Sequence, residues 1–146
     1  VETMKYPLSE KYNSEKLMKK IMGPNPLKLQ EEMLTGHQIP AKSVVCDLGS
    51  GQGLTSMFLA KEYGFIVYAT DLWCDPEENR KFFSEMGLSE EKVIAIKADA
   101  NDLPFDKEFF DAVISTDSYN FFGLDPEFLD AKLLPFVRSS HLIFHR

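Results

Sequence analysis

The residues with the clearest chemical potential form a glycine-rich turn behind an acidic residue. Gly49, Gly51 and Gly53 follow the apolar segment 44–48, which contains Asp47. A backbone without side chains at every second position can turn sharply and approach a ligand closely. The helix expected behind the turn offers N–H groups and the positive end of its dipole. The turn is therefore a candidate ligand site, although the same residues could serve only to connect a strand to a helix.

The acid before the glycines bears on the kind of ligand. Dinucleotide-binding turns have the spacing G-x-G-x-x-G and hold a pyrophosphate at the helix N-terminus. Here the spacing is G-x-G-x-G, and Leu54 occupies the last glycine position of that pattern. A carboxylate at Asp47 would repel a pyrophosphate but would suit an ammonium group. These features disfavour a nicotinamide-dependent oxidoreductase.

Acidic residues also follow the next two apolar segments. Asp71 comes after 65–70, about 20 residues beyond the glycines, where an acid can accept both hydroxyls of a ribose. It could instead cap a helix, but Asp75-Pro76 is the better cap, which leaves Asp71 without an obvious structural role. Asp99 comes after 93–98 and can accept a hydrogen bond from an adenine amino group, or it is only a loop carboxylate. Trp73 could stack on an adenine or simply pack.

These residues need an alternating framework of strands and helices. We expect strands at 43–48, 65–70, 93–98, 112–116 and 141–145, and helices at 54–63, 76–86 and 126–134. Two more helices should precede the first strand. One begins at the cap Ser14 and runs to Met22 with Leu17, Met18 and Ile21 on one face, and the other runs from Pro26 to Gly36 with Leu27, Leu29, Met33 and Leu34. The alternation predicts an α/β fold with a doubly wound parallel sheet, which binds ligands at the carboxyl ends of its strands.

Composition narrows the function classes further. The chain has 146 residues and a net charge of −7, which argues against a nucleic-acid surface. No apolar run is long enough to span a membrane, and no cleavable signal peptide is evident. Cys46 and Cys74 form neither a disulfide framework nor a metal cluster, and His141 and His145 are too far apart on one strand to bind a metal unaided. A reducing cytoplasm fits, with no metal cofactor.

The motifs together resemble those of class I S-adenosylmethionine (SAM) methyltransferases. The resemblance lies in the runs DLGSGQG, ATDLW, ADANDLPF and FFDAVISTDSYNFFG and covers about residues 14–146. More narrowly, the chain resembles the bacterial small-molecule branch that includes ubiquinone/menaquinone-biosynthesis and cyclopropane-fatty-acid-like enzymes. The resemblance implies a Rossmann-like methyltransferase domain at 43–146, preceded by an N-terminal arm and helices at 1–42. Those helices either form a lid over the cofactor or cover one edge of the sheet.

The resemblance also implies roles for residues at the strand ends. The residues expected to hold the methionine part of SAM are Asp47, Gly49, Ser50, Gly51 and Gly53. Those expected at the nucleoside are Asp71 for the ribose, Leu72 and Trp73 beside the adenine, and Asp99 with Ala100 at the adenine edge. Those expected at the methyl end are Ser115, Thr116 and Asp117, with Asp117 and Tyr119 as candidates for contact with the methyl acceptor.

The expected activity is methyl transfer from SAM to a small-molecule acceptor, with S-adenosylhomocysteine as the product. The family sheet normally has seven strands, whereas this chain ends in the fifth, so we expect the last strands to be missing. A chain of this kind could also bind SAM, or its product, without turnover. The unpaired edge of the fifth strand predicts self-association, as a homodimer.

Overall fold

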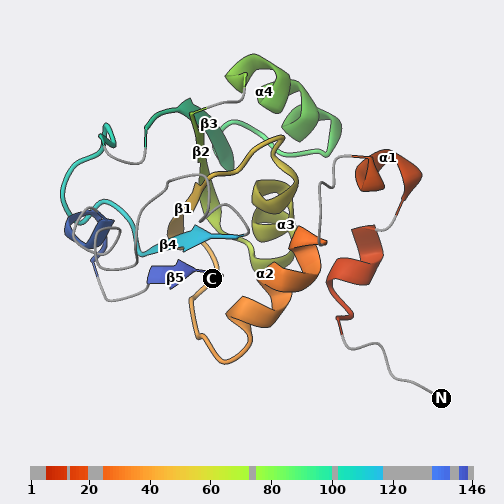
Figure 1. The fold of residues 1–146 in the computed structure, drawn as a ribbon, viewed down its shortest axis with the longest axis horizontal. Coiled ribbons are helices and arrows are strands. Elements are labelled where there is room, and N and C mark those ends of the chain that lie inside the picture. Colours follow the sequence, from red (N-terminus) through yellow and green to blue (C-terminus); the bar gives the residue numbers. More distant parts are fainter. Residues whose placement is uncertain are drawn as a thin grey trace.

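The computed structural model describes residues 6–12, 14–19, 25–72, 75–99, 102–116, 133–138 and 142–144. Its centre is a five-stranded parallel sheet with the strand order β3-β2-β1-β4-β5 (Figure 1). The strands are β1 (Val44–Leu48), β2 (Ile66–Asp71), β3 (Val93–Lys97), β4 (Ala112–Ser115) and β5 (Leu142–Phe144). The order reverses between β1 and β4, and this is the position at which parallel sheets of this type bind ligands. The predicted α/β fold class is confirmed.

The three longer helices begin and end at the predicted signals. They are α2 (Pro26–Leu34), α3 (Leu54–Tyr63) and α4 (Pro76–Glu85). Asn25 and Asp75 cap α2 and α4 through their side chains, and each is followed by a proline in the first turn. Gly64 ends α3 in the left-handed conformation that glycine adopts without steric cost.

Two other expectations differ from the structure or lie partly outside it. Ser14 caps a helix as predicted, but α1 covers only Glu15–Met18, and the rest of the expected helix to Met22 lies mostly beyond the described residues. Of the residues expected on one face of this helix, Leu17 is buried and Met18 is 42% exposed. The expected helix at 126–134 falls almost entirely outside the described residues. The structure describes its last two residues, Leu133 and Leu134, and Leu134 begins the 3-10 helix η3 (Leu134–Phe136).

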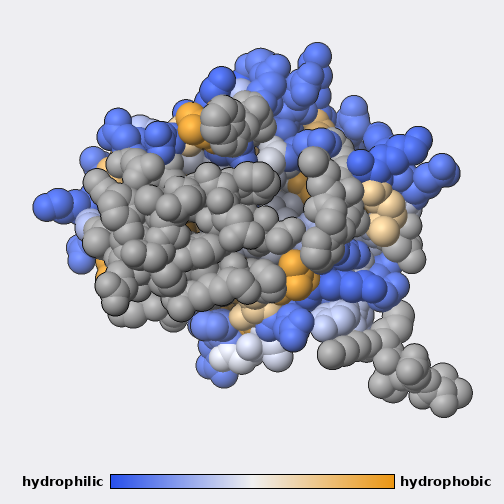
Figure 2. Space-filling model, viewed as in Figure 1, coloured by the Kyte–Doolittle hydropathy of each residue, from blue (hydrophilic) through white to orange (hydrophobic). Residues whose placement is uncertain are grey.

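Each face of the sheet has its own apolar cluster, because successive strand residues point to opposite sides. Val45 and Val67 pack with α2, α3 and α4 on one face, whereas Cys46 and Leu48 pack with Leu103 and other residues on the other. Figure 1 shows α2 and α3 on one side of the sheet and the dark blue η3 on the other. The outer surface of α4 is hydrophilic (Figure 2). The N-terminal helix α2 therefore shares one core with the sheet.

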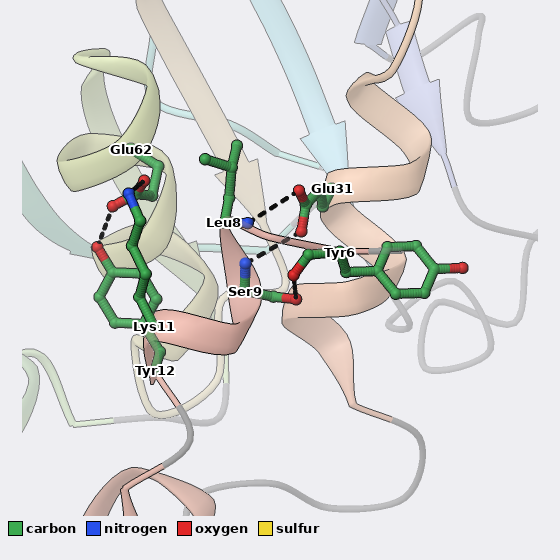
Figure 3. Close-up of polar contacts among 7 residues, drawn as sticks. All are labelled: Tyr6, Leu8, Ser9, Lys11, Tyr12, Glu31 and Glu62. Atoms are coloured by element: carbon green, nitrogen blue, oxygen red, sulfur yellow. Dashed lines mark hydrogen bonds and ion pairs between the residues drawn. The ribbon is translucent and has the colours of Figure 1, made fainter. Parts of the chain in front are cut away.

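Two glutamates fasten the N-terminal segment to this core (Figure 3). The buried carboxylate of Glu31 in α2 accepts hydrogen bonds from the backbone N–H groups of Leu8 and Ser9, at 3.1 and 3.0 Å. Glu62 in α3 accepts from the Tyr12 hydroxyl and pairs with Lys11 at 2.9 Å. Burial raises the pKa of Glu62, but the hydrogen bonds from Tyr12 and Lys11 and the nearby lysine charges outweigh it and lower the pKa overall. The 3-10 helix η1 (Ser9–Tyr12) is thus held against both α2 and α3.

None of the helices in the described parts of the chain is long and apolar enough to cross a membrane.

The contact between Gly53 and Phe83 gives a prediction about stability. Gly53 has a φ of 90°, and a Cβ there would lie 2.8 Å from the Phe83 ring, which is buried against α3. Gly53→Ala should lower the free energy of unfolding by about 2–4 kcal/mol, from the left-handed backbone and from overpacking together. Gly36→Ala is the matched control, because Gly36 has a φ of 91° and open space around its Cβ position. Its cost should be about 1–2 kcal/mol, and equal losses in urea unfolding would show that the Phe83 contact is unimportant.

Candidate functional site

The site begins with a buried carboxylate at the end of β1. Asp47 is 1% exposed, and its Oδ2 atom accepts hydrogen bonds from the hydroxyls of Thr55 and Ser56, at 2.6 and 2.7 Å. These two residues lie in the first turn of α3. The carboxylate therefore joins the end of the strand to the start of the helix and fixes the glycine turn between them.

The surroundings of Asp47 favour its protonated form. Burial raises the pKa of its carboxyl to about 6, against the opposing effect of the Thr55 and Ser56 hydrogen bonds, and the negative charge of Asp71 adds to the rise. An ionised Asp47 is therefore a buried negative charge that a bound cation would stabilise.

The backbone of the glycine turn is held from the side of β2. The N–H groups of Gly49 and Ser50 both donate to the Thr70 carbonyl, at 2.8 and 3.2 Å. The Gly51 N–H donates to Oδ2 of Asp71 at 2.8 Å, and the Gly51 carbonyl accepts from the Asn79 side chain at 3.1 Å. Asp71 thus has a structural contact that the sequence did not indicate.

Asn79 is a site residue that the sequence analysis missed. It is only 4% exposed and lies on the same face of α4 as Phe82 and Phe83, at helical spacing. A polar residue three positions before two buried aromatic residues is the signal that could have revealed it, because buried amides need hydrogen-bond partners.

The glycine turn has open space beside Gly51. A Cβ at Gly51, whose φ is 56°, would meet no atom within 4 Å. The Ser50 hydroxyl is buried and has no hydrogen-bond partner among the described residues. Space beside a fixed backbone, together with an unpaired polar atom, fits a ligand that contacts the turn.

The predicted nucleoside residues lie at the ends of the neighbouring strands β2 and β3. Asp71 is half-buried and Leu72 is 38% exposed, while Asp99 is exposed just beyond β3. The Ala98 N–H donates to the Asp71 carbonyl at 3.2 Å, which brings these two strand ends together. Leu72 follows Asp71 directly, and an exposed leucine there can cover one face of an aromatic ring. Trp73 and Ala100 lie outside the described residues.

The predicted methyl-end residues lie on the other side of β1. Ser115 and Thr116 are buried, and the register pairs Asp47 with Ile114, so both residues come just beyond that pair at the carboxyl end of the sheet. Thr116 accepts a hydrogen bond from the side chain of Gln30 in α2, at 3.1 Å. The sequence analysis did not identify Gln30 as a site residue. The predicted residues Asp117 and Tyr119 lie outside the described residues.

Comparison with known families identifies the class of protein. The methyltransferase domain family matches residues 46–133, more than half of the chain. The chain therefore belongs to this family, and its sheet has the Rossmann-like fold of SAM-dependent methyltransferases.

Two curated relatives are both sarcosine/dimethylglycine N-methyltransferases. The protein from Aphanothece halophytica is 34% identical over 80 residues, which are 54% of this chain and 28% of the relative. The protein from Halorhodospira halochloris is 34% identical over 84 residues, which are 57% of this chain and 30% of the relative. The matched part of this chain thus spans less than a third of the length of either relative.

Solved structures show the same fold at low sequence identity. A protein from Methanococcus maripaludis, assigned as an S-adenosyl-L-methionine-dependent methyltransferase, has a TM-score of 0.70 at 20% identity, over 99% of this chain and 65% of its own. The geranyl diphosphate C-methyltransferase of Streptomyces coelicolor, crystallised with S-adenosyl-L-homocysteine, has a TM-score of 0.64 at 20% identity, over 79% of this chain and 42% of its own.

The raised pKa of Asp47 gives a prediction about pH. The folded state binds this proton more tightly than the unfolded state, so the Asp47 contribution to stability should improve as the pH falls through 6 towards 4 and should be constant above pH 7. The difference in unfolding free energy between Asp47→Asn and the wild type should therefore change by about 2–3 kcal/mol between pH 7.5 and 4. Denaturant unfolding at several pH values measures it, and carboxyl NMR titration of Asp47 reports the midpoint directly. Parallel stability profiles of the two proteins would contradict the buried charge.

Proposed function

We propose that this chain binds SAM across the carboxyl ends of its strands and, as part of a methyltransferase, transfers the methyl group to a small molecule. The observation that carries the proposal is the way in which the backbone of Gly51 is held. It is held by Asp71 on one side and Asn79 on the other, beside space that a Cβ would enter without contact. A rigid backbone surface with open space beside it is suited to hold part of a cofactor.

The residues present fit the two ends of SAM. The predicted methionine residues are Asp47 and the turn from Gly49 to Gly53, where the negative charge of Asp47 favours the cationic end of the cofactor. Asp71 is proposed to accept the ribose hydroxyls, Leu72 with Trp73 to flank the adenine, and Asp99 with Ala100 to read its edge. Ser115 and Thr116 lie on the β4 side, where the methyl end is proposed.

The chemistry asks little of the protein beyond alignment. SAM supplies an activated methyl group on a sulfonium, and the chain's own residues orient it towards the acceptor and keep water away. A general base is needed only for an acceptor that must lose a proton. Asp117 and Tyr119 remain the proposed residues for contact with the acceptor.

The acceptor is proposed to be a small molecule. The net charge of −7 disfavours a nucleic acid, and the few cysteines suit a reducing compartment such as the cytoplasm. The curated relatives are named for sarcosine and dimethylglycine, so small amines are the first acceptors to screen. The sequence motifs resemble those of the bacterial quinone-biosynthesis and cyclopropane-fatty-acid-like enzymes, so the acceptors of those enzymes are the second group to screen.

The contact between Gln30 and Thr116 supports a role for the N-terminal helices as a cover over the site, because it brings α2 to the end of β4.

Calorimetric titration of Gly51→Ala tests the proposed cofactor site. The added methyl group would enter the open space beside the clamped peptide, so SAM and S-adenosylhomocysteine should bind at least about 10-fold more weakly. Gly36→Ala is the control for the backbone, since both glycines have positive φ and open Cβ positions. The two variants should lose similar stability, and only Gly51→Ala should lose affinity. Unchanged affinity in Gly51→Ala would show that the glycine serves only the turn. SAM binding without transfer to any acceptor would favour a binding protein.

The edge of the sheet gives a prediction about self-association. Among the described residues β5 pairs only with β4, so one of its edges has no strand beside it. Free strand edges recruit other chains, and a two-fold homodimer is the commonest closed form. Sedimentation velocity at micromolar concentration should show a dimer. A monomer would contradict the prediction, and a dimer that survives deletion of residues 139–146 would place the interface elsewhere.

A further inference from the structure

The buried face of α2 contains two polar residues between two leucines. Leu27, Gln30, Glu31 and Leu34 are all buried and follow helical spacing. Glu31 has a structural reason to be there, because its two carboxylate oxygens accept the Leu8 and Ser9 N–H groups (Figure 3). For Gln30, only one of the two polar side-chain atoms has a partner. Its Nε2 atom donates to Thr116, but its Oε1 atom is buried with no hydrogen-bond partner among the described residues.

An unpaired buried acceptor is costly. Leaving such a group without a partner costs about 1–3 kcal/mol, and a leucine or methionine at this position of the helix would avoid that cost. The only other buried side-chain polar atom without a partner in the described part of the chain is Oγ of Ser50, in the glycine turn. Both atoms belong to segments that meet the carboxyl ends of β1 and β4, where the strand order reverses. Two such atoms beside neighbouring strand ends favour a polar ligand there.

The hydrogen-bonding character of the unpaired Gln30 atom indicates which group of the ligand it contacts. In the orientation in which Nε2 donates to Thr116, the free atom of Gln30 is the acceptor Oε1, so its partner must carry an N–H or O–H group. The acids proposed for the ribose and the adenine follow β2 and β3, on the far side of β1 from Thr116. At the opposite end of SAM the sulfonium has no hydrogen to donate and the carboxylate is an acceptor. The α-ammonium group is the donor that remains, and Asp47 in the neighbouring strand β1 supplies a carboxylate that favours its charge.

We propose that Gln30 is a cofactor-binding residue whose Oε1 atom accepts a hydrogen bond from the α-ammonium group of SAM. Thr116 holds the carboxamide in the required orientation through Nε2, and α2 thereby forms one wall of the methionine end of the site. This inference rests on the proposed function and adds to it a residue from outside the sheet.

Calorimetry with three nucleosides tests the assignment. Gln30→Met keeps the length of the side chain and removes the acceptor, so SAM and S-adenosylhomocysteine should bind roughly 10- to 100-fold more weakly, the loss expected for a hydrogen bond to a charged group. 5′-Methylthioadenosine lacks the amino-acid part, so its affinity should change less than about twofold. Leu29→Met, at a half-buried position of the same helix, is the control and should leave all three affinities unchanged.

A second substitution tests the sign of the interaction. Gln30→Glu keeps acceptor oxygens at the same place, so its SAM affinity should exceed that of Gln30→Met. A loss with Gln30→Glu as large as with Gln30→Met would overturn the assignment to the ammonium group. Equal losses for SAM and 5′-methylthioadenosine in Gln30→Met would show a structural role instead.

The wild-type titration separates the two proposals. SAM binding by the wild type with unchanged affinity in Gln30→Met would overturn the role of Gln30 and leave the proposed function intact. No SAM binding by the wild-type chain would overturn both.

Discussion

The hydrogen bonds that the buried Asp47 carboxylate accepts from α3 are the interaction on which the rest of the site depends. A charge taken out of water is costly unless hydrogen bonds compensate for it, and here the hydroxyls of Thr55 and Ser56 offset part of that cost. Because both hydroxyls belong to the first turn of α3, the same bonds fix where the helix begins. The turn from Gly49 to Gly53 must close the distance between two fixed ends, and its positive φ angles follow from that constraint.

The other side of the turn is fixed by β2 and α4. The Thr70 carbonyl accepts hydrogen bonds from two N–H groups of the turn. Asp71 accepts from the Gly51 N–H, and the Asn79 side chain donates to the Gly51 carbonyl. A carboxylate has about four acceptor positions, so the contact with Gly51 is compatible with ribose binding by Asp71. Asp71 can therefore align the backbone of the turn and also accept the ribose hydroxyls in the proposed function. Such coupling means that a substitution at Asp71 disturbs both the turn and the proposed ribose contact, whereas Gly51→Ala leaves the Asp71 carboxylate in place.

Much of the fold could be predicted from local signals. The strands β1 to β4, the caps Asn25 and Asp75, and the helix end at Gly64 each depend on residues close in sequence. The positions that could not be predicted depend on contacts between distant segments. Met18 has the spacing of a core residue but is exposed, because burial requires a neighbouring surface that periodicity does not reveal. The Asp71 contact with Gly51 and the Asn79 contact with its carbonyl arise only when β2 and α4 pack beside the turn.

The two polar residues on the buried face of α2 show how function can be separated from stability in such a core. Glu31 and Gln30 are neighbours, both are buried, and both bond to segments far away in sequence. Glu31 is matched by two backbone donors, and its presence is explained by the attachment of η1. Gln30 is matched at one end only, and packing gives no reason to prefer it to an apolar residue of the same size. A buried polar atom that the fold does not satisfy is a cost to the unliganded protein, and it is offset only when a ligand supplies the missing partner. Because Gln30 lies beside the end of β4, the ligand proposed for it is the one proposed for the glycine turn.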